Sequence, residues 1–415
     1  MKKHHILILL IPLLFACKAN LEKEASKEKM SSNDEVIGED YFEHKVEPQL
    51  AKHFEVSYHG NYKVVKTDAT FFPNGKEAEG EKRQDVLVLL QEGTSPPALT
   101  GELANATLIK IPVKTAAVNV QHSESYLREL GLEDKINAIG GLYSYDDEMR
   151  NKAMRGELGQ ISYSWHGPPN IEVLLERNPE VFLMTLANLD HKGSLDKCRQ
   201  LGVPTAAVFD WAEGEYLARA EWIKFYSLFF NAEEKANQVF QDIKERIESL
   251  KSLTANLEKK ESAMWGYYGS KQKWVMSISD FPGQYLRDAG LENVLLSNTK
   301  TNANGRQTLS TEELLSKGKD IDHWLLGDIH ASPLPQDAIM SSFKAWQNDK
   351  LYHNLTRVDP KSNSSDWYAT AIVRPDTVLA DLIKLVHPEL LQDYEPVFMG
   401  FYDKETQGAK EKELQ

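Results

Sequence analysis

Short apolar runs alternate with amphipathic segments through most of the chain. Beyond residue 114 such runs cover 116–120, 136–140, 181–185 and 206–209, and the stretches between them have helical spacing. Brief, mostly apolar runs are typical of strands buried on both faces of a sheet. Because strands that alternate with helices favour a parallel, layered sheet, we predict an α/β lobe over residues 114–231.

A long helical stretch follows this region. Residues 232–257 carry apolar side chains at helical spacing and contain no Gly or Pro, whereas Asn231 just before them marks a break. A helix of this length extends for about 35 Å or more, which is enough to bridge two lobes. The alternation then resumes, so we predict a second α/β lobe over 258–391, with strands at 263–268, 275–278, 294–296, 321–326 and 355–358.

The region before the first lobe has a strand pattern instead. Residues 54–58 and 62–66 alternate around a turn at 59–61, and 86–90 and 108–113 are further strand candidates. We therefore predict a small β extension over 41–113, packed on the first lobe. Residues 392–415 are left as a tail.

The first seventeen residues are typical of a lipoprotein signal peptide. Lys2 and Lys3 precede an apolar run at 6–14, and Ala16 stands just before Cys17. The run is too short to span a bilayer, which needs about twenty residues. We expect residues 1–16 to be removed, Cys17 to carry a lipid and the polar segment 17–40 to be a flexible tether. The alternative is an ordinary signal peptide with an accidental cysteine.

Both interpretations predict export to the cell envelope. With the lipid, we expect the protein to be anchored there, at the periplasmic face of a membrane in a Gram-negative cell.

Charge and cysteine content exclude several classes of protein. The chain of 415 residues has a net charge of −14, and loss of Lys2 and Lys3 takes it to −16. Such acidity, without a basic stripe, argues against nucleic acid as a partner. Apart from Cys17 the chain has one cysteine, Cys198, which we expect to be a small buried apolar residue.

One α/β unit is used twice. Residues 170–175 lead to a strand predicted to start at Val181, and residues 310–315 lead to one predicted to start at Ile321. In each copy a glutamate, Glu172 or Glu312, stands nine residues before its strand. This repetition predicts equivalent helices in the two lobes.

Several segments in this order resemble the substrate-binding proteins of ABC importers, in particular the class that carries cobalamin, ferric siderophores and haem. The resemblance covers roughly residues 111–391 and is carried by 130–132, 170–183, 219–224, 374–383 and 387–390. It implies two Rossmann-like lobes joined by a single long backbone helix, with a ligand cleft between them.

The resemblance also implies that a glutamate on each lobe meets arginines of the permease. Glu172 and Glu312 match these positions. The alternative is that each acid simply favours the positive end of a helix dipole, which is worth about 0.3–1 kcal/mol. Ser310 and Glu313 fit a capping box, which would leave Glu312 free to point outward.

Ligands of such lobes sit in the loops that follow the strands, and these loops are rich in aromatic residues. Trp165-His166-Gly167 resembles a Trp-x-Gly motif of the cobalamin binders, and 365–367 resembles their closing loop. The candidate cleft residues are Trp165, His166, His122, Tyr145, Tyr268, Arg306, Asp328, Asp366, Trp367 and Tyr368. Each aromatic residue has packing as its alternative, and Arg306 is either a partner for a carboxylate or catecholate or a solvated loop charge.

The expected function is capture of an iron chelate (siderophore or haem) or a cobalamin, and delivery to a permease dimer driven by a separate ATPase. The protein has no cofactor of its own in this interpretation, binds no resident metal and is a monomer. One alternative is a carrier of free Zn or Mn, for which His122, His191, Asp328 and His330 are available. Another is a structural surface lipoprotein. No Gly-x-Ser-x-Gly, His-Glu-x-x-His or Walker motif is present, so we do not expect an enzyme.

Overall fold

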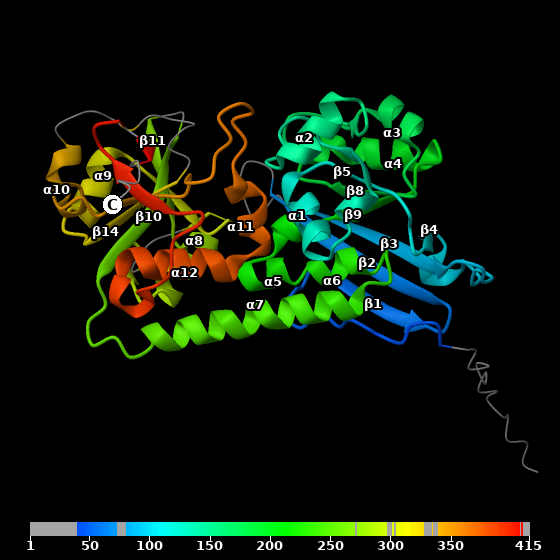
Figure 1. The fold of residues 1–415 in the computed structure, drawn as a ribbon, viewed down its shortest axis with the longest axis horizontal. Coiled ribbons are helices and arrows are strands. Elements are labelled where there is room, and N and C mark those ends of the chain that lie inside the picture. The colour runs from blue at the N-terminus through cyan, green and yellow to red at the C-terminus, as the bar shows by residue number, and fades with distance from the viewer. Residues whose placement is uncertain are drawn as a thin grey trace, which may run out of the picture. The chain divides into compact units, whose positions relative to one another are not determined.

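The computed structural model describes residues 40–72, 80–269, 272–296, 301–302, 304–327, 334, 339–406 and 408–409. The predicted signal peptide at 1–16, Cys17 and the predicted tether as far as residue 39 lie outside these ranges, as do Asp328 and His330. The described residues form three sheets with helices packed on them, and Figure 1 shows the two lobes above one long helix.

The β extension is a four-stranded sheet in sequence order. Its strands are β1 (Phe54–His59), β2 (Tyr62–Phe71), β3 (Glu81–Gln91) and β4 (Thr107–Ile111). The first three pair antiparallel and β4 runs parallel to β3. The predicted hairpin is confirmed: Gly60, which has a φ of 60°, occupies the turn between β1 and β2, where glycine adopts the left-handed conformation at little cost.

The first lobe has a five-stranded sheet in which every pairing is parallel. The strand order is β7 (Gly159–Gln160), β6 (Ile136–Ile139), β5 (Ala116–Val118), β8 (Val181–Thr185) and β9 (Thr205–Val208). The helices between the strands are α1 (Gln121–Glu129), α2 (Asp147–Met154), α3 (Ile171–Arg177) and α4 (Lys192–Gln200). The predicted parallel α/β lobe is therefore confirmed, and Cys198 in α4 is fully buried, as expected.

The helical stretch after the first lobe is interrupted at Asn231, as the sequence predicted. Two short helices, α5 (Tyr216–Ala220) and α6 (Ile223–Ser227), precede Asn231, whose φ of 53° interrupts the helical path. The bridging helix α7 (Glu233–Thr254) follows as one 22-residue element, which runs beneath both lobes in Figure 1. A helix of this length spans about 33 Å.

The second lobe has a mixed sheet. Its order is β13 (Arg306–Leu309), β11 (Lys273–Ser277), β10 (Ser262–Gly269), β14 (His323–Leu326), β15 (Leu351–His353), β16 (Gly400–Asp403) and β17 (Gly408–Ala409), and β12 (Glu292–Asn293) also pairs with β10. The helices are α8 (Phe281–Asp288), α9 (Thr311–Gly318), α10 (Lys344–Gln347), α11 (Thr370–Val373) and α12 (Pro375–Val386). Strands β10, β12, β14 and β15 are parallel, whereas β11, β13, β16 and β17 pair antiparallel with their neighbours.

Two predicted strands of this lobe are wrong. Residues 355–358 form a loop, and the strand of this region is β15, which pairs with β14 through Trp324 and Leu351. Likewise β12 ends at Asn293, so the strand predicted at 294–296 is not formed. Leu355 and Leu295 are nevertheless buried, which explains the errors, since apolar composition does not separate a buried loop from a strand.

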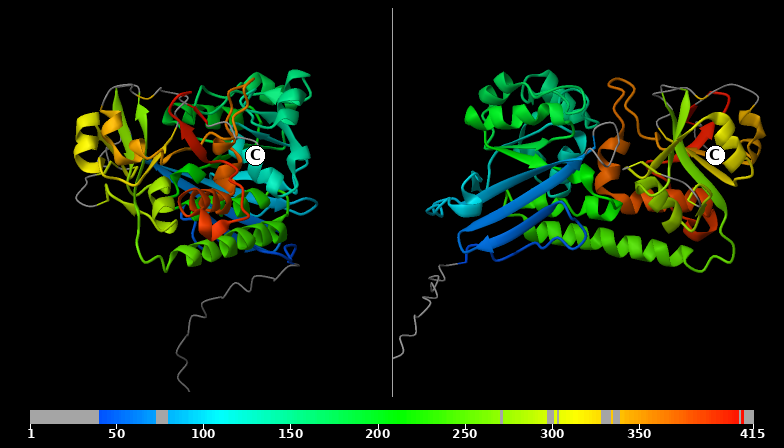
Figure 2. Two further views of the ribbon diagram at one scale, coloured as in Figure 1. Left: turned by 60° about the vertical axis from the view of Figure 1, so that its left-hand side comes forward. Right: turned by 180° about the vertical axis from the view of Figure 1, so that it is seen from behind.

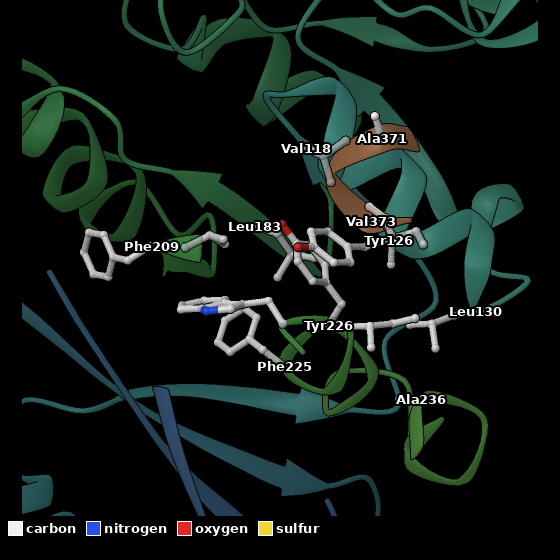
Figure 3. Packing of buried hydrophobic residues seen from close by; sticks show 14 of the residues in the cluster. Val118, Tyr126, Leu130, Leu183, Phe209, Phe225, Tyr226, Ala236, Ala371 and Val373 are labelled. Carbon is white, nitrogen blue, oxygen red and sulfur yellow. The ribbon is translucent and has the colours of Figure 1, made fainter. Parts of the chain in front are cut away.

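One hydrophobic core cluster extends across both lobes. Figure 3 shows Tyr126 of α1 beside Tyr226 of α6, whose rings stack with centroids 4.6 Å apart. Ala371 and Val373 of α11 belong to the same cluster, although they come from the second lobe. The lobes are therefore joined by direct packing as well as by α7.

Candidate ligand-binding cleft

Two adjoining cavities lie where the lobes meet, and together they are called the central cleft here. Their volumes are about 660 Å³ and about 190 Å³, and both are lined by Arg219, Phe281 and Arg306. Arg219 belongs to the first lobe, whereas Phe281 and Arg306 belong to the second. Other residues that line these cavities include His53, Thr70, Phe72, Trp211, Tyr216, Asp280, Tyr285, Trp367 and Tyr368.

The buried carboxylate of Asp210 holds the Arg219 side chain in place. Its Nε donates to Asp210 Oδ2 at 2.9 Å, and Nε2 of His122 lies 3.3 Å from the same oxygen. Burial by itself raises the pKa of Asp210, but His122 and Arg219 together hold that pKa well below its usual range. The Arg219 guanidinium lies 5.9 Å from the centroid of the Phe281 ring, within reach of a cation–π interaction.

Arg306 is held in an equivalent way on the opposite lobe. It begins β13, and its Nε donates to Asp280 Oδ2 at 2.6 Å. Burial raises the pKa of Asp280, although Arg306 opposes that effect. The central cleft is thus lined by one guanidinium from each lobe, and a guanidinium binds planar oxygen pairs such as those of carboxylates and catecholates.

Two tyrosine rings line the smaller cavity of the central cleft. The rings of Tyr216 in α5 and Tyr285 in α8 stack in parallel across the lobe boundary, with centroids 4.3 Å apart. The hydroxyl of Tyr216 also donates to Asp288 Oδ2 at 2.5 Å. Because these contacts join the two lobes, they hold this part of the cleft lining in place.

A third cavity of about 500 Å³, called the acidic cavity here, lies between α1 and the segment 357–370. Its charged lining residues are Glu124, Arg128, Asp146, Asp147, Arg357, Asp359 and Asp366. Contacts between the lobes border it: Arg150 Nη2 lies 3.2 Å from Asp359 Oδ2, and the Ser364 hydroxyl donates to the Ser144 carbonyl at 3.3 Å.

The predicted cleft residues are divided among several places. Arg306, Trp367 and Tyr368 line the central cleft, whereas Tyr145 and Asp366 line the acidic cavity. Asp366 is buried and accepts a hydrogen bond from Arg357 Nε at 2.7 Å.

Other predicted residues lie outside these cavities. Trp165 is 52% exposed and stands with Tyr143, Tyr163 and His166 in an aromatic cluster on the first lobe, where the Tyr143 and His166 rings are 4.5 Å apart. His122 is buried in α1 behind Arg219.

Tyr268 packs against Trp274 at 5.2 Å between ring centroids, and neither residue lines a cavity described above. Asp328 and His330 lie outside the described residues. His191, considered above for a free metal ion, is nearly buried.

The sequence prediction missed Arg219, Phe281 and Trp211 in the cleft wall. Arg219 and Phe281 lie within α-helices, and Trp211 lies in a short 3₁₀ helix, Asp210–Ala212, that the strand pattern did not single out. The segment 219–224 contributed to the family resemblance, so a signal existed for Arg219, but a helical arginine was not expected to line the cleft.

Glu172 and Glu312 occupy the same helix position, the second residue of α3 and of α9. Both are exposed, and neither forms a salt bridge within the described part of the chain. The predicted capping box of Ser310 and Glu313 is confirmed. The equal spacing to the strands is wrong, however, because β14 begins at His323 rather than Ile321, so the loop after α9 is longer than the one after α3.

The described residues contain neither a metal-binding cluster nor a membrane-spanning helix. In the ranges given above, no group of three or more His, Cys, Asp or Glu side chains is placed to hold a metal ion. Within the same ranges, no helix combines the length and the apolar composition that a membrane span requires.

Comparison with known proteins identifies the family. A family model described as periplasmic binding protein matches residues 121–354. Two uncharacterised lipoproteins of Methanocaldococcus jannaschii are 22% and 24% identical over 317 and 315 residues, covering 74% and 69% of this chain and 72% and 73% of their own. The structure of CeuE from Helicobacter pylori with Ni(II) bound has the same fold, with a TM-score of 0.50 at 16% identity, covering 69% of this chain and 88% of that one. The matched segment, more than half of the chain, shows that this chain belongs to the periplasmic binding protein family, and its two α/β lobes joined by a single bridging helix agree with the fold that the sequence resemblance implied.

Proposed function

We propose that this protein is the membrane-anchored solute-binding component of an ABC importer and that it holds a metal chelate in the central cleft. The observation that carries the proposal is the pair of guanidiniums, Arg219 from the first lobe and Arg306 from the second, which line the same cavity with aromatic neighbours. Ligand pockets of about 300–1,000 Å³ are usual for small molecules, and the larger cavity lies in that range.

The chemistry of the lining favours a ligand with acidic groups on a flat, partly apolar body. Ferric catecholate siderophores and haem present carboxylate or phenolate oxygens beside planar rings, which suit guanidiniums and aromatic faces. Phe281 and Trp367 offer such faces next to the arginines. Cobalamin shares the large macrocycle but lacks free carboxylates, so we place the acidic chelates first.

Delivery to the permease is assigned to Glu172 and Glu312. The two carboxylates occupy equivalent positions at the start of exposed helices, one on each lobe. A permease dimer offers two equivalent surfaces, so one glutamate for each permease subunit matches that symmetry.

The double variant Glu172→Lys/Glu312→Lys is expected to abolish uptake in cells and to leave chelate affinity within about twofold. Glu176→Lys, which reverses an exposed charge on the same helix α3, is the control, and a double variant that loses affinity would contradict the assignment.

The anchor is assigned to Cys17. A lipid there and the polar tether that follows would keep the lobes close to the permease and raise their effective concentration. Growth with a radioactive fatty acid should label the wild-type chain and leave Cys17→Ala unlabelled; label retained in the variant would refute the anchor.

The ligand assignment is tested by titrating the purified mature chain with a ferric tris-catecholate, with haemin and with cyanocobalamin. Each chelate has its own visible absorbance band, so a shift of that band reports binding directly. We expect saturation by one of the acidic chelates with micromolar or tighter Kd. Binding of Zn²⁺ or Mn²⁺ alone, measured by metal analysis after dialysis, with no response to any chelate, would refute the proposal.

A further inference from the structure

The β extension reaches the central cleft. Its residues His53, Thr70 and Phe72 line the larger cavity together with Trp211 and the arginines of the two lobes. Figure 2, in the view from behind, shows β2 running from the outer end of the first lobe toward the space between the lobes. The two α/β lobes alone would leave this side of the cavity without a wall.

Strand alternation explains why the end of β2 presents these side chains. Val65, Thr67, Ala69 and Phe71 are buried against the first lobe, and the Thr67 hydroxyl donates to the Ala207 carbonyl at 3.1 Å. Because successive side chains of a strand point to opposite faces, Thr70 and Phe72 point away from that lobe. Both are partly exposed.

The wall is held firmly in place. The ring of Phe71 packs on Trp211 at 4.9 Å between centroids, so the residue between Thr70 and Phe72 is fixed to a second cavity residue. The Glu213 carboxylate accepts hydrogen bonds from the backbone amides of Lys52 and His53 at 3.0 Å and from Trp222 Nε1 at 2.9 Å.

A second anchor joins the neighbouring strand to the first lobe. The buried carboxylate of Asp85 in β3 accepts from Arg199 Nη2 at 2.7 Å and from the Ala207 amide at 2.9 Å. Side chains on such a fixed element are preorganised, and little conformational entropy is lost when a ligand contacts them.

We infer that the β extension is a third wall of the ligand site, and that Thr70, Phe72 and His53 contact the aromatic or apolar periphery of an acidic metal chelate whose oxygens meet Arg219 and Arg306. The extension then acts as a specificity element: it admits chelates whose periphery fits between Phe72, Trp211 and Phe281 and excludes bulkier ones. This inference rests on the proposed function, since it names the part of the chelate that the extension recognises.

The test compares Thr70 with Ser57, a hydroxyl residue of the same sheet that is exposed and does not line the cavity. Thr70→Trp places a large side chain in the cavity and is expected to raise the Kd of the bound chelate by about tenfold or more. Ser57→Trp should leave that Kd within about twofold. The probes are the ferric tris-catecholate, haemin and cyanocobalamin, followed by absorbance on the full mature chain.

Thiol protection gives an answer that does not depend on the bulky variant folding. Thr70→Cys and Ser57→Cys, each made in a Cys17→Ala background, carry one accessible thiol apiece, since the remaining cysteine, Cys198, is buried. Saturating chelate is expected to slow maleimide labelling several-fold at Thr70→Cys and to leave Ser57→Cys unchanged. Equal labelling with and without chelate at Thr70→Cys, in protein that binds the chelate by absorbance, would overturn the inference and leave the proposed function standing. A wild-type chain that binds none of the three probes overturns both.

Discussion

We predict that Glu124 makes the stability of this protein depend on pH. The residue lies in α1 on the wall of the acidic cavity, and only 3% of its surface is exposed. Its Oε2 accepts a hydrogen bond from the Ser144 hydroxyl. Burial raises the pKa of Glu124 from 4.5 to about 8, although Ser144, Arg128 and Arg150 oppose the shift.

The sign and size of the effect follow from proton linkage. Between pH 4.5 and 8 the folded state keeps the proton that the unfolded state releases, so the free energy of unfolding falls as pH rises through this window. The contribution is fully present below pH 4.5 and lost above the folded pKa. One pKa unit corresponds to about 1.36 kcal/mol, so the loss between pH 5 and 8.5 is about 4 kcal/mol, taken as an upper value.

The assay is urea unfolding of wild type and Glu124→Gln at pH 5 and 8.5. The amide keeps a neutral side chain that accepts from Ser144, so the variant should lack this pH dependence, and the difference between the two proteins should change by up to about 4 kcal/mol. Glu148→Gln, at a side chain that is 62% exposed, is the control and should follow wild type. Parallel pH profiles for wild type and Glu124→Gln would refute the reasoning.

Two further predictions concern one buried ion pair and one cleft arginine. Lys63→Met leaves the Glu233 carboxylate buried without its ion-pair partner and should cost about 3–5 kcal/mol by urea unfolding, while Lys63→Met/Glu233→Leu should recover most of the loss; equal destabilisation by both would contradict this. Arg306→Ala removes one guanidinium from the central cleft and should weaken an acidic chelate by about 10- to 100-fold in the absorbance titration. Arg287→Ala, at an exposed arginine of the same lobe, should not, and an unchanged Kd for Arg306→Ala would remove that residue from the site.

Local pattern was enough for most of the fold. Apolar runs buried on both faces located four of the five strands of the first lobe and missed the short β7, and helical spacing located α7 and its break at Asn231. Capping chemistry at Ser310 was also correct. These features depend on residues within a few positions of each other, which is the range over which sequence periodicity carries information.

The errors occur where burial comes from distant contacts. Leu355 is buried in a loop of the second lobe, and apolar composition alone made it resemble a strand residue. The antiparallel β10–β11 hairpin was likewise not predicted, because buried runs were taken as parallel strands. The predicted tail proved to supply β16, which extends the second sheet.

By itself the sequence determined the α/β lobes, the bridging helix, the β extension and the family resemblance, because each is carried by local periodicity or by a short motif. Only the tertiary structure decided which side chains share a cavity. Arg219 and Arg306 are 87 positions apart in the chain, and Thr70 lies further still from Arg306, yet all three line the same cleft. Their proximity results from the packing of α11 on the first lobe and from the buried anchors of the extension, and no pattern along the chain encodes the distance between them.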